Sequence, residues 1–266
     1  MTKNFKLRIH DIFFKIIKNM LRSRGYDITH KENKTIINKE YPPDYSKQNI
    51  EIINKVEKYT MTSIERLDAL INSVNYIVKN NITGSFVECG VWKGGSVMAM
   101  ALSLINKGVL NRDIYLYDTF YGMSSPDIVD VNIYGTTADD YLSAFEKSED
   151  SIAWALAPKD KVKKNIYSTG YPKEKFKLIE GKVEYTLPEI MPEEISLLRL
   201  DTDWYESTKH EMNNLFPLLV KNGVLIIDDY GHWAGCKKAI DEYIEENNIC
   251  VLLNRIDNTG CISIKS

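Results

Sequence analysis

The sequence predicts an α/β protein with a doubly wound, mostly parallel sheet of seven strands, preceded by an N-terminal helical arm. From about residue 84 onward, short apolar runs alternate with longer segments of helical period. Strands that alternate with helices in this way form parallel sheets covered by helices on both faces. The last two apolar runs have only the turn Asn258-Thr259-Gly260 between them, so this final pair must be antiparallel.

The N-terminal part of the chain differs from the rest in charge, and we expect residues 1–60 to form a helical arm or lid and residues 61–266 the main domain. Through Lys34, nine basic residues stand against three acidic ones, although the whole chain carries a net charge of −3. Apolar residues recur here at helical spacing, at Ile9, Phe13, Ile16, Ile17 and Met20. Such an arm packs on its own domain or on a second subunit of a homodimer, or it lies as a basic amphipathic helix on an anionic membrane.

The first elements after the turn at Pro42-Pro43 are helical. We expect one helix over 49–58 and another over 63–80, because apolar residues of the second keep the 3.6-residue period and Thr62 or Ser63 can cap its start. A strand over 85–89, an apolar helix over 95–105 and a strand over 113–117 follow.

The second half of the chain begins with a long loop at 120–134, rich in Gly, Ser, Pro and Asp, of the kind that often forms a lid. Strands are then expected at 176–179, 196–200, 224–227, 250–253 and 261–264, and helices at 205–220, kinked at Pro217, and 234–247. A doubly wound sheet that closes on an antiparallel hairpin is the Rossmann-like arrangement of the class I methyltransferases.

Composition excludes several classes of protein. The net charge of −3 argues against binding to nucleic acid, which requires a basic surface. No apolar run approaches the roughly 18 residues of a transmembrane helix. The four cysteines are scattered and form no C-x-x-C motif, so we expect neither a zinc ribbon nor a disulfide framework, but a reducing, cytoplasmic location.

A glycine-containing loop joins the first strand to its helix, in the segment Glu88-Cys89-Gly90-Val91-Trp92-Lys93-Gly94. Glycines let the backbone approach a ligand, and the helix N-terminus offers free N–H donors. Three residues separate Gly90 from Gly94, unlike the dinucleotide pattern G-x-G-x-x-G, and Glu88 would repel a pyrophosphate. The pattern therefore favours a loop for S-adenosylmethionine, whose amino-acid end is cationic, although such turns also occur for packing alone.

The second strand ends in Asp118, in Tyr117-Asp118-Thr119-Phe120. In doubly wound folds an acidic residue at this place accepts hydrogen bonds from both ribose hydroxyls. The alternative is a helix-capping or turn aspartate. After the third strand, Glu180-Gly181-Lys182 is placed to border an adenine ring.

Acidic pairs follow the next two strands: Asp201 and Asp203 after one, Asp228 and Asp229 after the other. If these strands are neighbours, Asp201 lies about one strand spacing, roughly 4.8 Å, from the second pair. Carboxylates this close need a compensating cation, and hard oxygen ligands select magnesium, calcium or manganese. A solvated loop without metal is the alternative.

Together these motifs, with Asp118 to Met123, Asp201 to Thr208 and Asp228 to His232, resemble the macrocin O-methyltransferase family from about Tyr41 to the C-terminus. Those enzymes methylate sugar hydroxyls on macrolides with S-adenosylmethionine and magnesium. The resemblance implies a small-molecule or glycan acceptor, and Asp201, Asp228 and Asp229 as ligands of Mg²⁺. It also implies the following methyl-donor contacts: Met61, Thr62, Ser63, Glu88, Cys89, Gly90, Val91, Trp92, Ser96, Asp118, Thr119, Phe120, Gly122, Gly181 and Asp203.

Two candidates remain for the base that deprotonates the acceptor hydroxyl. Catechol-type enzymes place a lysine three residues after the first metal aspartate, but here that position is Trp204. Asp201 is the first candidate, by the resemblance, and His232 the second, because its imidazole follows an acidic strand end and has a suitable reference pKa.

Two other functions stay open at this point. Asp201-Thr202-Asp203 is a D-x-D segment that a metal-dependent glycosyltransferase could use on a nucleotide-sugar, although Glu88 and the Gly90–Gly94 loop would then have no role. A non-catalytic protein with the same fold is the third interpretation.

Overall fold

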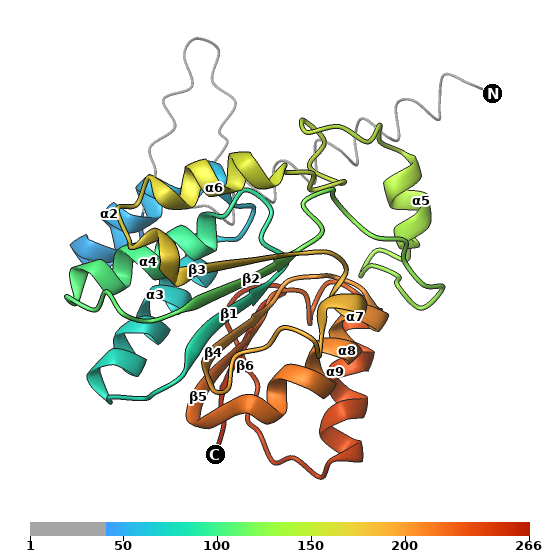
Figure 1. The fold of residues 1–266 in the computed structure, drawn as a ribbon. Helices are drawn as coiled ribbons and strands as arrows, with labels where there is room; N and C mark the ends of the chain where they lie inside the picture. Colours follow the sequence, from blue (N-terminus) through green and yellow to red (C-terminus); the bar gives the residue numbers. More distant parts are fainter. Residues whose placement is uncertain (1–40) are drawn as a thin grey trace.

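The computed structural model describes residues 41–266, and its central feature is one sheet of seven strands with the order β3-β2-β1-β4-β5-β7-β6 (Figure 1). The strands are β1 (Ser85–Cys89), β2 (Ile114–Asp118), β3 (Phe176–Glu180), β4 (Ile195–Leu200), β5 (Leu219–Ile227), β6 (Asn254–Arg255) and β7 (Cys261–Ile264). The first five pair in parallel, whereas β7 pairs antiparallel with both β5 and β6. The predicted fold class is confirmed.

The strand order reverses between β1 and β4, which lie side by side at the centre of the sheet. At such a switch point the connections leave the carboxyl ends of the two strands in opposite directions, and ligands bind in the crevice between them. The topology therefore predicts the position of the site before any side chain is considered.

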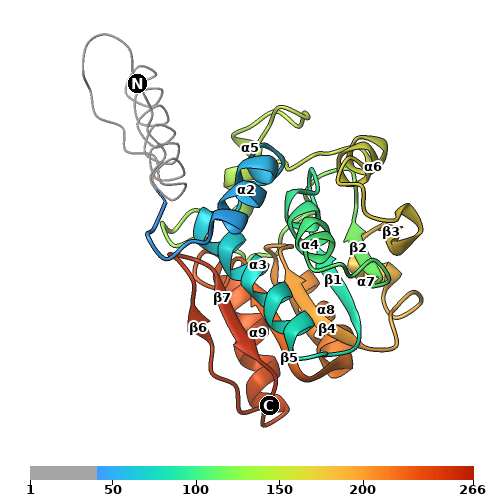
Figure 2. The same ribbon diagram turned by 90° about the vertical axis from the view of Figure 1, so that its left-hand side faces the viewer.

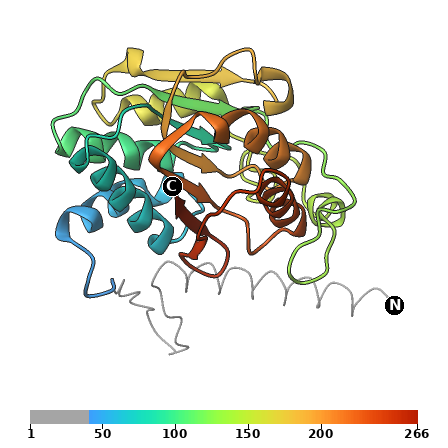
Figure 3. The same cartoon turned by 90° about the horizontal axis from the view of Figure 1, so that it is seen from below.

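Helices cover both faces of the sheet (Figures 1 and 3). They are α2 (Lys47–Val56), α3 (Ile64–Lys79), α4 (Gly95–Asn106), α5 (Ala138–Ser143), α6 (Lys159–Tyr167), α7 (Val183–Thr186), α8 (Tyr205–Leu215) and α9 (Ala234–Glu246), with single 3₁₀ turns at Glu57–Tyr59, Lys173–Lys175 and Phe216–Leu218. The layer of α2, α3, α4 and α6 packs on one face and contributes to one buried apolar cluster, while α8 and α9 contribute to a second cluster on the other face.

The start of α3 follows from local chemistry. The Ser63 hydroxyl accepts a hydrogen bond from the Arg66 amide at 3.1 Å and so caps the helix. The apolar face of the helix, with Leu67, Leu70 and Val74, is buried against α4 and the sheet. Burial of each such side chain stabilises the fold by about 1.5–3 kcal/mol, which holds the helix and its capping residues beside the carboxyl edge.

The hairpin at the sheet edge differs from the sequence-based prediction (Figure 2). The outer strand is Asn254–Arg255 and not 250–253, because the turn sets the register: Arg255 pairs with Cys261 and Asn254 with Ile262. The Asp257 carboxylate accepts hydrogen bonds from two amides of the turn and fixes it.

Two further differences concern the helices. The helix expected over 205–220 ends at Leu215, because Pro217 stands in a separate 3₁₀ turn and β5 then begins at Leu219. The short helices α5, α6 and α7 were not predicted.

The described part of the predicted arm, α2, packs against α3 and α4. The basic segment at residues 1–40 lies outside the described residues, so its place on the domain, on a second subunit or on a membrane stays a prediction. Within residues 41–266, no helix combines the length and apolar character needed to span a bilayer.

Candidate active site

Backbone hydrogen bonds tie the loops together at the carboxyl edge of the sheet. The first amide of each loop continues the ladder of its strand by donating to the last carbonyl of the neighbouring strand. Three such bonds, each 2.9 Å long, run from Asp228 to Leu200, from Asp201 to Cys89 and from Gly90 to Tyr117. Residues from β5, β4 and β1 are therefore held in fixed register just beyond the sheet.

Gly90 shows how close these loops are. Its φ is +82°, and a Cβ at this position would lie 1.9 Å from the backbone carbonyl oxygen of Asp201. Both the conformation and the space therefore require glycine. The predicted donor loop and the loop of the acidic pair are in direct backbone contact.

A cavity opens above these strand ends and brings together most of the residues predicted from the sequence. The predicted residues that line it are Met61, Thr62, Glu88, Gly90, Val91, Trp92, Ser96, Asp118, Thr119, Gly122, Gly181, Asp201, Asp203, Asp228 and Asp229. One cavity thus contains the residues predicted for the methyl donor and those predicted for the metal.

Four predicted residues lie elsewhere. Ser63 caps α3 and donates to the Asp257 carboxylate at 2.6 Å. The side chains of Cys89 and Phe120 are buried in the two apolar clusters. The ring of His232 packs edge-on against Trp233 at 5.0 Å, and it does not belong to the cavity lining.

Glu88 is a buried carboxylate aimed at the cavity, with only 1% of its surface exposed. One oxygen pairs with Arg199, while Oε2 has no hydrogen-bond partner among the described residues. Burial raises the pKa of Glu88 to about 7, although the Arg199 guanidinium opposes this shift. An unsatisfied acidic oxygen of this kind fits the cationic amino group of an amino-acid-like ligand.

Asp118 ties the first two loops together. Its carboxylate accepts hydrogen bonds from the amides of Val91 at 2.6 Å, Trp92 at 3.0 Å and Phe120 at 2.6 Å. A carboxylate has about four acceptor sites, so capacity for one further bond remains. The side chain thus shapes the glycine-containing loop and still lines the cavity.

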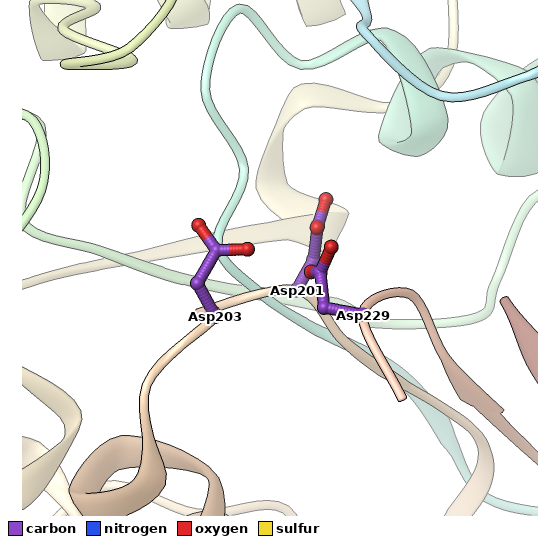
Figure 4. A group of neighbouring side chains, drawn as sticks. All are labelled: Asp201, Asp203 and Asp229. Atoms are coloured by element: carbon purple, nitrogen blue, oxygen red, sulfur yellow. The ribbon is translucent and has the colours of Figure 1, made fainter. Parts of the chain in front are cut away.

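Asp201, Asp203 and Asp229 form a cluster whose carboxylate oxygens lie within 4.8 Å of one another. Figure 4 shows the three side chains projecting to the same side of the strand ends. Because β4 and β5 are neighbours, the expected proximity of Asp201 to Asp229 is confirmed.

The cluster has the character of a cation site. Burial raises the pKa of Asp201 and of Asp203 well above the usual range, and the charge of Asp229 adds to both shifts. Oδ2 of Asp229 is buried without a partner among residues 41–266. Clustered, unsatisfied carboxylate oxygens fit a divalent cation that prefers oxygen ligands.

Asp228 has a different environment from the other three aspartates. Its carboxylate pairs with the guanidinium groups of Arg66 and Arg199 and accepts a hydrogen bond from the Thr62 hydroxyl at 3.1 Å. Two arginines contact this carboxylate, whereas Asp201 contacts Arg199 alone, and the cluster of three carboxylates includes Asp203 in place of Asp228. A role for Asp228 as a metal ligand stays a prediction.

Comparison with known proteins decides the family. The family model described as macrocin-O-methyltransferase (TylF) matches residues 15–264. The chain belongs to the macrocin O-methyltransferase family. The family is one of methyltransferases, so this membership favours methyl transfer over the glycosyltransferase alternative.

Individual macrocin O-methyltransferase relatives agree with this assignment. Demethyldecarbamoylnovobiocin O-methyltransferase of Streptomyces niveus is 31% identical over 202 residues, 76% of this chain and 74% of that protein. A tetracenomycin-C 4'-O-methyltransferase of Streptomyces olivaceus, named for its dimethoxy-rhamnosyl substrate, is 32% identical over 203 residues, 76% of this chain and 74% of that protein. The solved structure of the O-methyltransferase NovP has a TM-score of 0.67 at 29% identity, covering 78% of this chain and 82% of that one. The chain is accordingly an O-methyltransferase.

Sequence analysis missed two residues in this methyltransferase site, Arg66 and Arg199. Arg199 stands between Leu198 and Leu200 in a buried strand whose other residues carry no charge. A lone charge in a buried strand must be paired, and this signal could have identified it. Arg66 lies on α3 and reaches Asp228 and Asp257, and nothing in the sequence indicated this contact.

Proposed function

We propose that this protein transfers the methyl group of S-adenosylmethionine to a hydroxyl of a sugar or a glycosylated small molecule, with Mg²⁺ in the site. One observation carries the proposal: the buried Glu88 carboxylate and the Asp201, Asp203 and Asp229 cluster line the same cavity. The substrates named for the relatives support the choice of acceptor, since they include novobiocin and mycinamicin derivatives and a rhamnosyl tetracenomycin.

On this proposal, the methyl donor lies over the ends of β1 and β2. The free oxygen of Glu88 accepts a hydrogen bond from the donor's amino group, and Asp118 uses its remaining acceptor site for the ribose. Gly181, which follows β3 and has a φ of +141°, borders the adenine. The loop ends at Gly94, the N-cap of α4, whose amide donates to the Val91 carbonyl at 2.9 Å.

Asp201, Asp203 and Asp229 would hold the divalent cation. When bound, such an ion lowers the pKa of a hydroxyl that reaches it. Asp201 and Asp229 directly follow the ends of neighbouring strands, and Asp203 lies two residues after Asp201, so the sheet brings the three side chains together. This fixed spacing positions the acceptor, and in well-oriented reactions positioning contributes about 7–11 kcal/mol.

Asp201 is our candidate for the base. Its carboxylate lines the cavity beside Asp229, and burial raises its pKa well above that of an ordinary aspartate. His232 is the weaker candidate, because burial lowers its pKa and its ring packs against Trp233 outside the cavity lining. An unchanged pH–rate profile in His232→Gln would be consistent with this ranking.

The proposed function is tested by incubating the protein with labelled methyl donor and a panel of glycosides, with Mg²⁺ or with EDTA. Asp229→Asn should lose Mn²⁺ binding and reduce transfer at least about 100-fold while S-adenosylhomocysteine still binds. Asp160→Asn, at an exposed acid far from the cavity lining, is the matched control. Full turnover in EDTA would refute the metal, and failure to bind S-adenosylhomocysteine would refute the donor.

The third ligand can be assigned in the same experiment. If the carboxylate cluster is the cation site, Asp203→Asn weakens Mn²⁺ binding more than Asp228→Asn does. The opposite order would restore the ligand set of Asp201, Asp228 and Asp229 expected from the sequence.

We further propose a cytoplasmic homodimer with residues 1–60 as an arm or lid. The described cysteines are all free, which suits a reducing compartment. Light scattering of the full chain and of a form lacking residues 1–40 tests the dimer, and flotation with anionic vesicles tests membrane association.

A further inference from the structure

Arg199 is a buried charge at the centre of the sheet, on β4, with 2% of its surface exposed. Its Nη1 donates to the Glu88 carboxylate and lies 2.8 Å from an oxygen of Asp201. Its Nη2 lies 2.5 Å from Asp228 and 3.1 Å from the Thr62 hydroxyl. The two terminal nitrogens thus have four partners, from β1, β4, β5 and the segment before α3.

This environment differs from that of Arg112, a half-buried arginine beside the sheet. Arg112 donates to the backbone carbonyls of Gly84 and Ile82 and to the Ser196 hydroxyl, which is a structural role at the opposite end of the strands. Arg199 instead has three carboxylate partners, and all three line the cavity. Its guanidinium therefore stands behind the donor and cation sites, and in contact with both.

We propose that Arg199 is a positioning residue that couples the two sites, so that binding of the methyl donor strengthens binding of the divalent cation, and the reverse. The inference rests on the proposed function. Glu88 and Asp201 share one terminal nitrogen of Arg199, so fixing one carboxylate fixes the guanidinium and through it the other. The first ligand to bind orders the Arg199 guanidinium and its carboxylate partners. The second ligand then binds groups that are already ordered.

Coupling of the two sites requires the planar shape of the Arg199 guanidinium as well as its charge. The two terminal nitrogens contact different partners, Nη1 contacting Asp201 and Nη2 contacting Asp228. A lysine ammonium is a single point and cannot contact all of these partners at once. Arg199→Lys therefore keeps the positive charge and removes the link.

The test is a thermodynamic cycle on the full chain. S-adenosylhomocysteine binding is measured by calorimetry with and without Mn²⁺, and Mn²⁺ binding by electron paramagnetic resonance with and without S-adenosylhomocysteine. In the wild type we expect each ligand to tighten the other about fivefold or more, by the same factor in both directions. In Arg199→Lys the factor should fall to about one, while Arg112→Lys keeps the wild-type factor and changes only thermal stability.

Three results would overturn the inference: no coupling in the wild type, coupling that persists in Arg199→Lys, or equal loss in Arg112→Lys. If Arg199→Lys does not fold, Thr62→Val removes one of the four contacts and must reduce the factor; an unchanged factor would again refute the idea. Failure of the wild type to bind Mn²⁺ or S-adenosylhomocysteine at all would instead refute the proposed function itself, so the two failures are distinguishable.

Discussion

Glu211 is a carboxylate on α8 that supports the acidic loop from behind, and its replacement should change how stability depends on pH. Its side chain is fully buried, and Oε1 accepts a hydrogen bond from the Thr202 hydroxyl at 2.9 Å. The other oxygen has no partner in the described part of the chain. Burial raises the pKa of Glu211 to about 8 from its ordinary value of 4.5.

The direction in which Glu211 makes stability depend on pH follows from proton binding. Between the unfolded pKa of 4.5 and the folded pKa of about 8, the folded chain holds a proton on Glu211 that the unfolded chain has lost. The stability that this proton contributes is present at low pH and is lost as pH rises through this window. At 1.36 kcal/mol for each pH unit, the loss from pH 5 to pH 8 is about 4 kcal/mol.

Glu211→Gln keeps the shape and the Thr202 contact but cannot take up the proton. We expect its free energy of unfolding, relative to the wild type, to rise by about 4 kcal/mol from pH 5 to pH 8, or roughly 10 °C in Tm. Urea unfolding of both proteins in EDTA at several pH values measures this difference. Because the comparison is between two proteins, the titration of Asp201 and Asp203 cancels. A difference that stays constant with pH would refute the reasoning.

Two further predictions concern Glu88 on β1 and the loop that follows this strand. Gly90→Ala places a Cβ 1.9 Å from the Asp201 carbonyl at a φ of +82°, and should destabilise the fold by more than about 3 kcal/mol. Gly108→Ala, at a φ of +71° with nothing within 4 Å, should cost only about 1 kcal/mol in the same denaturation assay. The affinity for S-adenosylhomocysteine should fall below about pH 7, up to tenfold per unit, because only ionised Glu88 holds the amino group well. Glu88→Gln should bind S-adenosylhomocysteine weakly and without this pH dependence. An affinity that changes with pH in Glu88→Gln as it does in the wild type would contradict the role of Glu88.

Sequence patterns predicted those parts of the fold where local signals are strong. The bounds of β1 and β7 agree with the predicted ranges, since both are apolar runs bounded by polar residues or glycine. The shared cavity could also be predicted, because parallel strands end at one edge and each end carries its acidic residue. Periodicity and topology were sufficient for these features.

The remaining features depend on contacts between distant segments. Asp228 looks equivalent to Asp229 in the sequence, yet Arg66 from α3 and Arg199 from β4 both form salt bridges with Asp228, and neither does so with Asp229 in the described structure. The helices α5 and α7 are too short to give a periodic signal. The position of β6 depends on a turn geometry that apolar content does not reveal.

The contact between Gly90 and the Asp201 carbonyl has a consequence for how new specificities can arise. Neither loop can gain a residue or shift without displacing the other. We therefore expect the proposed donor site and the proposed cation site to change together. The segment 123–157 is anchored beside these loops, because the buried Asp130 accepts a hydrogen bond from the Tyr205 amide at 2.8 Å and the Ser124 carbonyl accepts one from the Trp204 indole at 3.1 Å. Substitutions at these strand ends should therefore disturb both sites at once, and we expect most of them to yield inactive proteins.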